Sequence, residues 1–355
     1  MSEQYGNPYR WVVVRSNPQY GAPTYHHRIS GLSGKLKCRL TALTPLFVGG
    51  NKKNGEVYLL KTVDGRDTPF IPGTSLKGRF RSLVEILADS PAPFKSPEKG
   101  LKKRLDSASR IFGTLHGADG ADGTVYSGSV QCSDAKYVGL LSFNQWTSYK
   151  VVVGKPKPEH TAFYPTNRDR KFYLHKHGAT TLQTTQLNQS RTVRPAPPDS
   201  AFEFDVEYTS LSPADLSLLI YSIVLEKHVV VSIGSKASGL QLENSIQLAG
   251  PMRHKIGGCK GVNRGSSHIE ITQWDRYPSF VDRYRHGQRK ADSPTELQAV
   301  IDEIIAPLVA RIDDTMLDLR AATIYCDGDP RTKSLRYPSK DWFNENSKTA
   351  IPPIR

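Results

Sequence analysis

The segment with the clearest chemistry is 69–81, Pro-Phe-Ile-Pro-Gly-Thr-Ser-Leu-Lys-Gly-Arg-Phe-Arg, which combines a stiff turn, a helix start and several cations. Pro72 and Gly73 interrupt the preceding segment, and the hydroxyl of Thr74 or Ser75 can cap a new helix. Apolar side chains then recur at helical spacing, which leaves the cations mostly off the apolar face. Backbone N–H groups and basic side chains at a helix start favour an anion, so the segment predicts a phosphate site unless the helix is simply solvated. The cations are Lys77, Arg79 and Arg81.

A second basic segment, 253–265, reads Arg-His-Lys-Ile-Gly-Gly-Cys-Lys-Gly-Val-Asn-Arg-Gly. Four glycines among basic residues allow a backbone to approach phosphates closely, with N–H groups facing the anion. The segment matches neither the GxxxxGK[ST] loop nor the GxGxxG fingerprint, so it does not support nucleoside triphosphate chemistry.

The stretch 145–200 interleaves basic with aromatic residues, as in Arg-Asp-Arg-Lys-Phe-Tyr at 168–173. Aromatic rings stack on unpaired bases while cations meet phosphates, so the pattern is typical of single-stranded nucleic-acid binding. The alternative is an ordered surface insertion whose aromatic residues cover a small core of their own. His175 and His177 fall on one side of an extended segment, where they would bind a metal weakly or face solvent.

The composition favours a polyanionic partner, because 48 Lys and Arg residues outnumber 34 Asp and Glu residues and give a net charge of +14. Cys38, Cys132, Cys259 and Cys326 are far apart and form no CxxC pair, which indicates a reducing cytoplasm rather than a disulfide framework or a zinc site. No apolar run approaches the roughly 18 residues of a membrane span, and the polar start does not resemble a signal peptide. We therefore expect a soluble cytoplasmic protein with no membrane partner.

The elements that would position these segments alternate between strand and helix. Strands are predicted from the alternation that begins at Gly34 and over 125–132 and 202–208, with one helix after Gly73. A second helix is predicted after Ser212, which is followed by a proline and then an acid at the third position. This repeated strand–helix–strand pattern predicts an α+β fold with a ferredoxin-like, RRM-like core (a palm) whose two helices share one face.

The predicted domains are an N-terminal extension at 1–35 with one strand at most, the core at 36–272 containing the insertion 145–200, and a helical C-terminal extension at 273–355. The extension begins with a basic aromatic stretch. A strong helix follows, with Ser293 and Glu296 as a capping box, and Pro307 should kink or divide it.

Three segments in this order resemble the RAMP superfamily, and more narrowly the backbone subunit of type III CRISPR effector complexes. They are 71–78 (Ile-Pro-Gly-Thr-Ser-Leu-Lys-Gly), 111–113 (Ile-Phe-Gly) with 128–135, and the glycine loop 257–265. The stretches 155–173 and 192–195 are similar to a larger-insert, type III-D-like branch. The resemblance covers roughly residues 36 to 272.

This resemblance implies a palm that polymerises along a CRISPR RNA, contacts its backbone without reading its sequence, and carries a thumb at 145–200. The implied partners are CRISPR RNA, target RNA and other type III effector subunits, including backbone paralogues and the large polymerase-like signalling subunit. The expected RNA-binding residues are Gly73, Ser75, Lys77, Arg79, Arg81, Lys171, Arg191, Arg194, His254, Lys255, Lys260 and Arg264.

Members of this family that cleave target RNA use an aspartate in the loop before the Ile-Pro-Gly motif. Glu56 is the corresponding carboxylate here, although its side chain is one methylene longer and the usual proline is replaced by Tyr58. Asp64 and Asp67 are alternative acids, and Asp64 is more simply part of a turn. No cofactor is required by the sequence, and a divalent cation is a candidate only for cleavage.

The competing function is a stand-alone RAMP endoribonuclease that processes precursor CRISPR RNA with a histidine as general base. His160, His175 and His177 are the residues available for that chemistry. The large insertion and the extra C-terminal helix favour assembly into a complex, because a processing enzyme needs neither.

Overall fold

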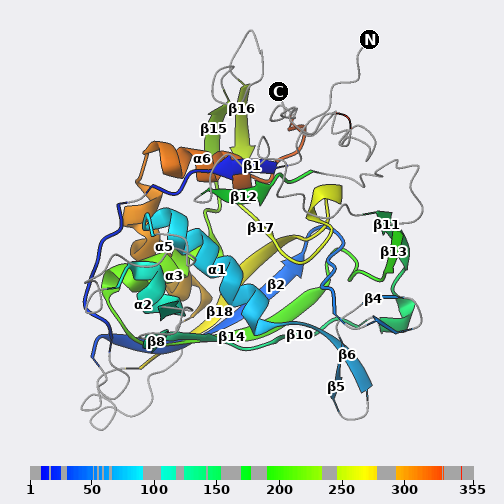
Figure 1. The fold of residues 1–355 in the computed structure, drawn as a ribbon, viewed down its shortest axis with the longest axis horizontal. Helices are drawn as coiled ribbons and strands as arrows, with labels where there is room; N and C mark the ends of the chain where they lie inside the picture. The colour runs from blue at the N-terminus through cyan, green and yellow to red at the C-terminus, as the bar shows by residue number, and fades with distance from the viewer. Residues whose placement is uncertain are drawn as a thin grey trace.

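The computed structural model describes residues 9–15, 17–24, 30–50, 52–53, 56–57, 60–63, 66–90, 105–116, 124–140, 143–152, 169–176, 190–233, 246–277, 293–329, 331 and 345. Its centre is an antiparallel sheet with helices packed on one face (Figure 1). The α+β class predicted from the sequence is confirmed.

The core of this sheet has the strand order of a ferredoxin-like fold. In chain order its elements are β2 (Leu32–Ala42), α1 (Gly73–Leu87), β9 (Val130–Cys132) with β10 (Ala135–Tyr137), β14 (Ala201–Leu211), α3 (Pro213–Val224) and β18 (Ser266–Tyr277). In space β18 lies beside β2, β2 beside β14, and β14 beside both β9 and β10. The sheet continues to β17 (His254–Lys255) at one edge, and through β6 (Arg66–Ile71) to β5 (Leu60–Val63) at the other. This order confirms the strand–helix–strand repeat expected from the sequence.

The two faces of the sheet differ in polarity because side chains alternate along each strand. Leu36 and Leu40 of β2 are fully buried on the helical face, where Phe80 of α1 stacks on Phe204 of β14. On the open face, Lys35 donates to Asp205 at 2.8 Å, and the other cations of β2 lie opposite acids of β14. The charges on this open face are therefore largely compensated.

The two core helices begin in different ways. The Ser212 hydroxyl caps α3 by accepting from the Asp215 N–H at 3.1 Å, as predicted. The predicted caps of α1 are wrong, because Pro72 occupies the cap position and makes no side-chain hydrogen bond. The Gly73 N–H instead donates to the carboxylate of Asp134 at 3.0 Å, and this contact joins the helix start to the turn between β9 and β10.

The N-terminal segment and the insertion form smaller sheets around the palm. One pairs β1 (Tyr9–Val12), close to the strand expected near the N-terminus, with β12 (Arg170–Tyr173). Another has the order β11 (Tyr149–Val152), β13 (Ser190–Val193), β4 (Glu56–Val57) and β3 (Lys52–Lys53). Two further hairpins form separate sheets, β7 (Gly113–His116) with β8 (Thr124–Ser127) and β15 (Val229–Ile233) with β16 (Ile246–Gly250). The short helix α2 (Ser107–Phe112) packs into the main core. The thumb role of 145–200 and the domain boundaries remain predictions.

Two helices follow β18 and pack against the core. The capping box of Ser293 and Glu296 starts α5 (Pro294–Val309), as the sequence predicts. Pro307 does not divide this helix, because it lies in the last turn. A short connection leads to α6 (Asp314–Thr323), which lies beside β1 (Figure 1).

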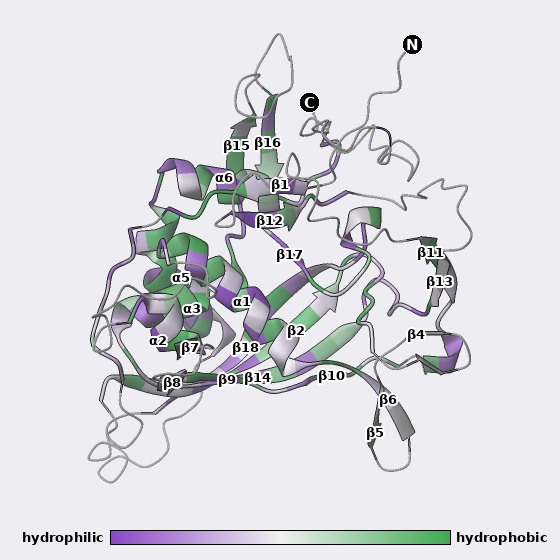
Figure 2. Cartoon of the chain, in the orientation of Figure 1, coloured by the Kyte–Doolittle hydropathy of each residue, from purple (hydrophilic) through white to green (hydrophobic). Residues whose placement is uncertain are grey.

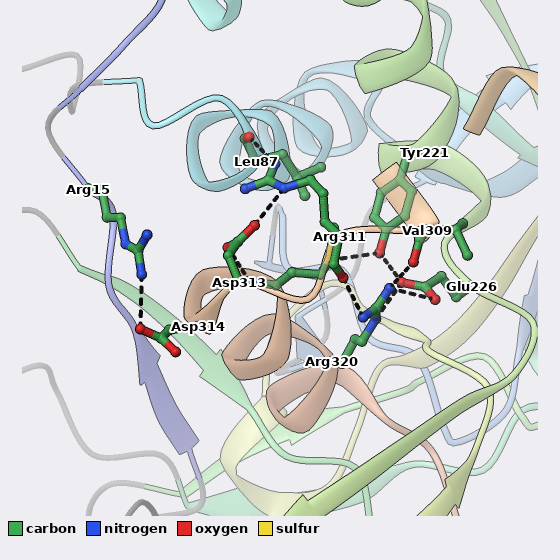
Figure 3. A network of polar contacts seen from close by, with 10 residues as sticks. Arg15, Leu87, Tyr221, Glu226, Val309, Arg311, Asp313, Asp314 and Arg320 are labelled. Carbon is green, nitrogen blue, oxygen red and sulfur yellow. Dashed lines mark hydrogen bonds and ion pairs between the residues drawn. The ribbon is translucent and has the colours of Figure 1, made fainter. Parts of the chain in front are cut away.

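A buried polar network holds these C-terminal helices to α3 (Figure 3). The carboxylate of Glu226 accepts from the Arg320 guanidinium at 2.8 Å and from the Tyr221 hydroxyl at 2.6 Å. Arg320 also donates to the backbone carbonyls of Val309 and Arg311, which close the end of α5. Figure 2 shows that α3 is largely hydrophobic. No helix in the described part of the chain is long and apolar enough to cross a membrane.

Candidate nucleic-acid interface

Four cations from α1, β17 and the loop after it lie at one end of the palm. We call Arg79, Lys255, Lys260 and Arg264 the cationic cluster. Lys260 lies close enough to Arg79 and to Lys255 for their charges to repel. Lys255 donates from its ammonium to the Asn263 side-chain oxygen at 3.0 Å and to the Arg264 carbonyl at 3.3 Å, which joins the cluster to the glycine loop 257–265.

The cationic cluster has no acidic counterpart in the part of the chain that the structure describes. Among the described residues, none of its four side chains pairs with a carboxylate. The Nε atoms of Arg253 and Arg264 are also buried, with no hydrogen-bond partner among the described residues. Buried cations are costly unless they are paired, so negative charge supplied from outside the chain would stabilise this cluster.

Burial and mutual repulsion lower the pKa values in the cluster. The pKa of Lys255 falls to about 7, because its ammonium is desolvated and lies near Lys260. Desolvation and the charge of Arg79 lower the pKa of Lys260 to about 8. Burial lowers the pKa of Arg79 to about 10, so this guanidinium keeps its charge at neutral pH. An anion bound here would favour the charged forms of both lysines.

The Arg79 guanidinium is held in place by neutral groups. Its Nε–H donates to Nδ1 of His254 at 3.4 Å, and its carbon lies 4.7 Å from the ring centre of Phe172. His254 is fully engaged, because its Nε2 donates to the Ile223 carbonyl at 2.8 Å. Burial and the neighbouring Arg79 lower the pKa of His254 far below its usual range, so it positions Arg79 as a neutral acceptor.

His175 cannot serve as the general base that the processing hypothesis requires. Its ring nitrogens lie 3.0 Å from the Ser266 hydroxyl and 3.1 Å from the Arg253 carbonyl, and the side chain is buried. Burial and the nearby Lys255 also hold its pKa well below the usual histidine range. His160 and His177 lie outside the described residues.

The glycine loop uses its glycines for close packing. Gly257 and Gly265 have φ of +83° and +79°, and a side chain on either would collide with a backbone carbonyl. The Gly258 N–H donates to the Phe47 carbonyl at 2.7 Å, and the Gly265 N–H donates to the Pro45 carbonyl at 3.0 Å. These N–H groups therefore face the segment after β2, contrary to the expectation that they face an anion. The loop contributes its positive charge through side chains.

The structure separates the three cations predicted on α1. Arg79 faces the cluster, whereas Lys77 lies on the other side of the helix near Arg81 and Cys132. Arg81 is engaged inside the fold, where it donates to Glu85 at 2.9 Å and to the Gly113 carbonyl at 2.6 Å. The internal partners of Arg81 argue against one RNA path for all three cations, and the RNA contact of Arg81 stays a prediction.

Gly73 and Ser75, the other predicted contacts at the start of α1, differ in their surroundings. Gly73 is buried, and a side chain there would lie 2.2 Å from the Cys132 carbonyl. Packing therefore requires a glycine at position 73, and the Gly73 N–H already donates to Asp134. Ser75 is exposed and remains a predicted contact.

The predicted contacts in the insertion lie on two different sheets. Lys171 of β12 places its ammonium 3.6 Å from the ring centre of Tyr9. Arg194 follows β13, donates to the Ser148 hydroxyl at 3.2 Å and lies 5.0 Å from the ring centre of Phe143. The backbone of Arg191 lies in β13, and its side chain is outside the described part.

The candidate catalytic residue Glu56 lies in a strand rather than in the expected loop. Its backbone in β4 pairs in parallel with Thr192 of β13. Its side chain lies outside the described part of the structure. Among the described residues, no group of three or more His, Cys, Asp or Glu side chains could hold a metal ion.

Segment 169–176 of the insertion docks on the palm beside the cluster through contacts that the sequence did not reveal. Arg170 pairs with buried Glu85 of α1, and Phe172 stacks on Arg79. Asn263 accepts from the Lys176 N–H at 3.0 Å and also bonds the Lys176 carbonyl through its amide nitrogen. Asn263 has φ of +59°, a conformation that asparagine tolerates better than most residues.

The lowered pKa of Lys255 predicts a pH dependence of folding. At neutral pH the folded state disfavours the charged amine that the unfolded chain carries, with its ordinary pKa of 10.5. Stability therefore rises as the pH increases from about 7 towards 10, by at most about 1.4 kcal/mol per pH unit from this group. We expect Lys255→Met to be more stable than wild type near pH 7, with a gap that narrows towards pH 9 in urea unfolding. A gap that stays constant with pH would contradict the assignment.

Comparison with known proteins adds family evidence to this geometry. A model of the RAMP superfamily matches residues 39–238, more than half of the chain. No curated protein matches the chain. Among solved structures, Csc2 of Thermofilum pendens has a TM-score of 0.35 and 13% identity and covers 82% of each chain. A type IV-B CRISPR complex has a TM-score of 0.38 and 14% identity over 73% of this chain and 94% of its own. At these scores neither likeness bears on function.

Proposed function

The chain belongs to the RAMP superfamily, and on this basis we propose that it is the guide-binding backbone subunit of a type III, III-D-like CRISPR effector complex. In this function it holds CRISPR RNA and paired target RNA in antiviral defence. It contacts the sugar-phosphate backbone, and base pairing to the guide selects the target.

The observation that carries the proposal is the cationic cluster without carboxylate partners. Phosphates spaced along an RNA strand would supply the missing negative charge, and Arg79, Lys260 and Arg264 are the half-buried members that a phosphate can reach. The open face of the sheet fits this role less well, because its cations already lie opposite acids of β14. The guide therefore follows the end of the palm where α1 meets the glycine loop.

The type III assignment rests on the order of the motifs and on the type III-D-like insertion. Neighbouring backbone paralogues and the large signalling subunit are partners in the same proposal. Segment 169–176 supports a thumb that is anchored on the palm, because it contacts Arg79 and Asn263 directly.

Cleavage of the target RNA by this chain is a separate proposal that depends on Glu56. The placement of Glu56 in β4, beside the strand that leads to Arg194, puts the carboxylate-bearing segment on the insertion side of the palm. A displacement of the reacting groups by about 1 Å costs roughly 100-fold in rate. The longer side chain of a glutamate, in place of the family's aspartate, is therefore expected to slow cleavage unless the strand compensates for its length. Any target cleavage should disappear in Glu56→Ala while guide binding persists.

The competing processing function is disfavoured because His175 is buried and both of its ring nitrogens are engaged. Incubation of wild type, Glu56→Ala and His175→Ala with precursor RNA, and with guide plus matched target, separates the two functions. We expect stoichiometric, salt-sensitive particles that protect the guide, with no processing of the precursor. Precursor cleavage by wild type that is lost in His175→Ala would contradict the proposed function.

A further inference from the structure

The rim of the cationic cluster carries an arginine stacked on an exposed tyrosine. The Arg264 guanidinium carbon lies 4.8 Å from the ring centre of Tyr149, the first residue of β11. Tyr149 is 42% exposed, so its side chain remains partly accessible from solvent. The Nε atom of Arg264 is buried without a partner, and no carboxylate among the described residues neutralises this guanidinium.

The elements that carry this pair are packed firmly together. Tyr149 lies opposite Val193 of β13, and the glycine loop supplies Arg264 from the palm. Buried Phe47, Val151 and Val193 pack together beneath them, and Cys259 of the loop covers this small core. The ring and the guanidinium are therefore held at a fixed junction between the palm and the insertion.

A second arginine–aromatic pair lies at the same end of the β11–β13 sheet. Arg194 stacks on Phe143 and donates to Ser148, the residue next to Tyr149. Phe143 also packs edge-on against buried Trp146, so it belongs partly to the core. Of the two rings that contact an arginine at this end of the sheet, Phe143 and Tyr149, Tyr149 is the more exposed.

We propose that Tyr149 is a stacking platform for one base of single-stranded RNA, with Arg264 holding the adjoining phosphate. This inference rests on the proposed function and adds a base contact to a site otherwise described by phosphates. An exposed ring beside an unpaired guanidinium suits a nucleotide, because stacking uses the base and the cation uses the phosphate. Every base has a π-face, so this contact adds affinity with little sequence preference.

The test compares binding of a short oligouridylate with binding of an abasic ribose-phosphate oligomer of the same length. Tyr149→Ala should weaken oligouridylate binding about tenfold and leave abasic binding unchanged, whereas Tyr149→Phe should retain wild-type affinity. Arg264→Ala should weaken both oligomers, because the phosphate is common to them. Tyr277→Ala is the matched control, since this tyrosine is also 42% exposed and ends β18 at the opposite end from β17.

The outcomes separate this inference from the function on which it rests. If wild type binds the abasic oligomer and Tyr149→Ala has no effect on oligouridylate, or weakens both oligomers equally, the stacking platform is wrong while backbone binding stands. If wild type binds neither oligomer, the proposed function fails and the platform fails with it. Selective loss of oligouridylate binding in Tyr149→Ala, restored in Tyr149→Phe, would establish the platform.

Discussion

Replacing Glu226 with alanine is expected to lower the free energy of unfolding by about 3–5 kcal/mol. The Glu226 carboxylate is buried and accepts from the Arg320 guanidinium and the Tyr221 hydroxyl. The variant would leave the Arg320 charge buried without a counterion. The backbone carbonyls at the end of α5 would still accept hydrogen bonds from Arg320, but they would not neutralise its charge. The packing of α5 and α6 against α3 would weaken as a consequence.

Urea unfolding of the two proteins at one pH measures this difference. Asp314→Ala is the control within the same region (Figure 3), because its ion pair with Arg15 is solvent-exposed on both sides. We expect that control to change stability by less than about 1 kcal/mol. Equal effects of the two substitutions would mean that the buried network contributes no more than a surface ion pair.

Replacing Arg79 with glutamine is expected to weaken binding of single-stranded RNA by about 10- to 100-fold. A hydrogen bond to a charged group contributes about 1.5–3 kcal/mol, and about 1.4 kcal/mol corresponds to a factor of ten. Arg79 is the member of the cationic cluster that His254 and Phe172 hold in a fixed orientation, so little ordering remains to be done when a phosphate binds.

The same substitution should leave the unbound protein no less stable than wild type. Arg79 has no acidic partner among the described residues, and removing a desolvated cation relieves repulsion from Lys260. Loss of affinity without loss of stability distinguishes a binding residue from a packing residue. Arg39→Gln is the matched control, because Arg39 lies on the open face of the sheet, opposite Glu203.

Local signals in the sequence were sufficient for much of the fold. The alternation in β2, the Ser212 cap and the capping box at Ser293 each depend on residues within a few positions of one another. These patterns gave the two strand–helix–strand units, and the structure joins them in the ferredoxin-like order.

The arrangement of the site depends on contacts distant in sequence, which local patterns do not encode. Lys77, Arg79 and Arg81 look equivalent in the sequence, but Arg81 is taken up by Glu85 and the Gly113 carbonyl. The pairing of β1 with β12, and the stack of Phe172 on Arg79, join segments far apart along the chain. Net charge and composition therefore indicated a polyanionic partner. Only the structure identifies which cations have no carboxylate partner among the described residues.

The salt dependence of RNA binding tests the central claim most directly. The logarithm of the association constant for a single-stranded oligomer should fall linearly with the logarithm of salt concentration, and each phosphate contact adds about 0.7 to that slope. We predict that Arg79→Gln makes the slope shallower by about this amount, while Arg39→Gln leaves it unchanged. An unchanged slope in Arg79→Gln, or a shallower one in Arg39→Gln alone, would contradict an RNA path along the cationic cluster.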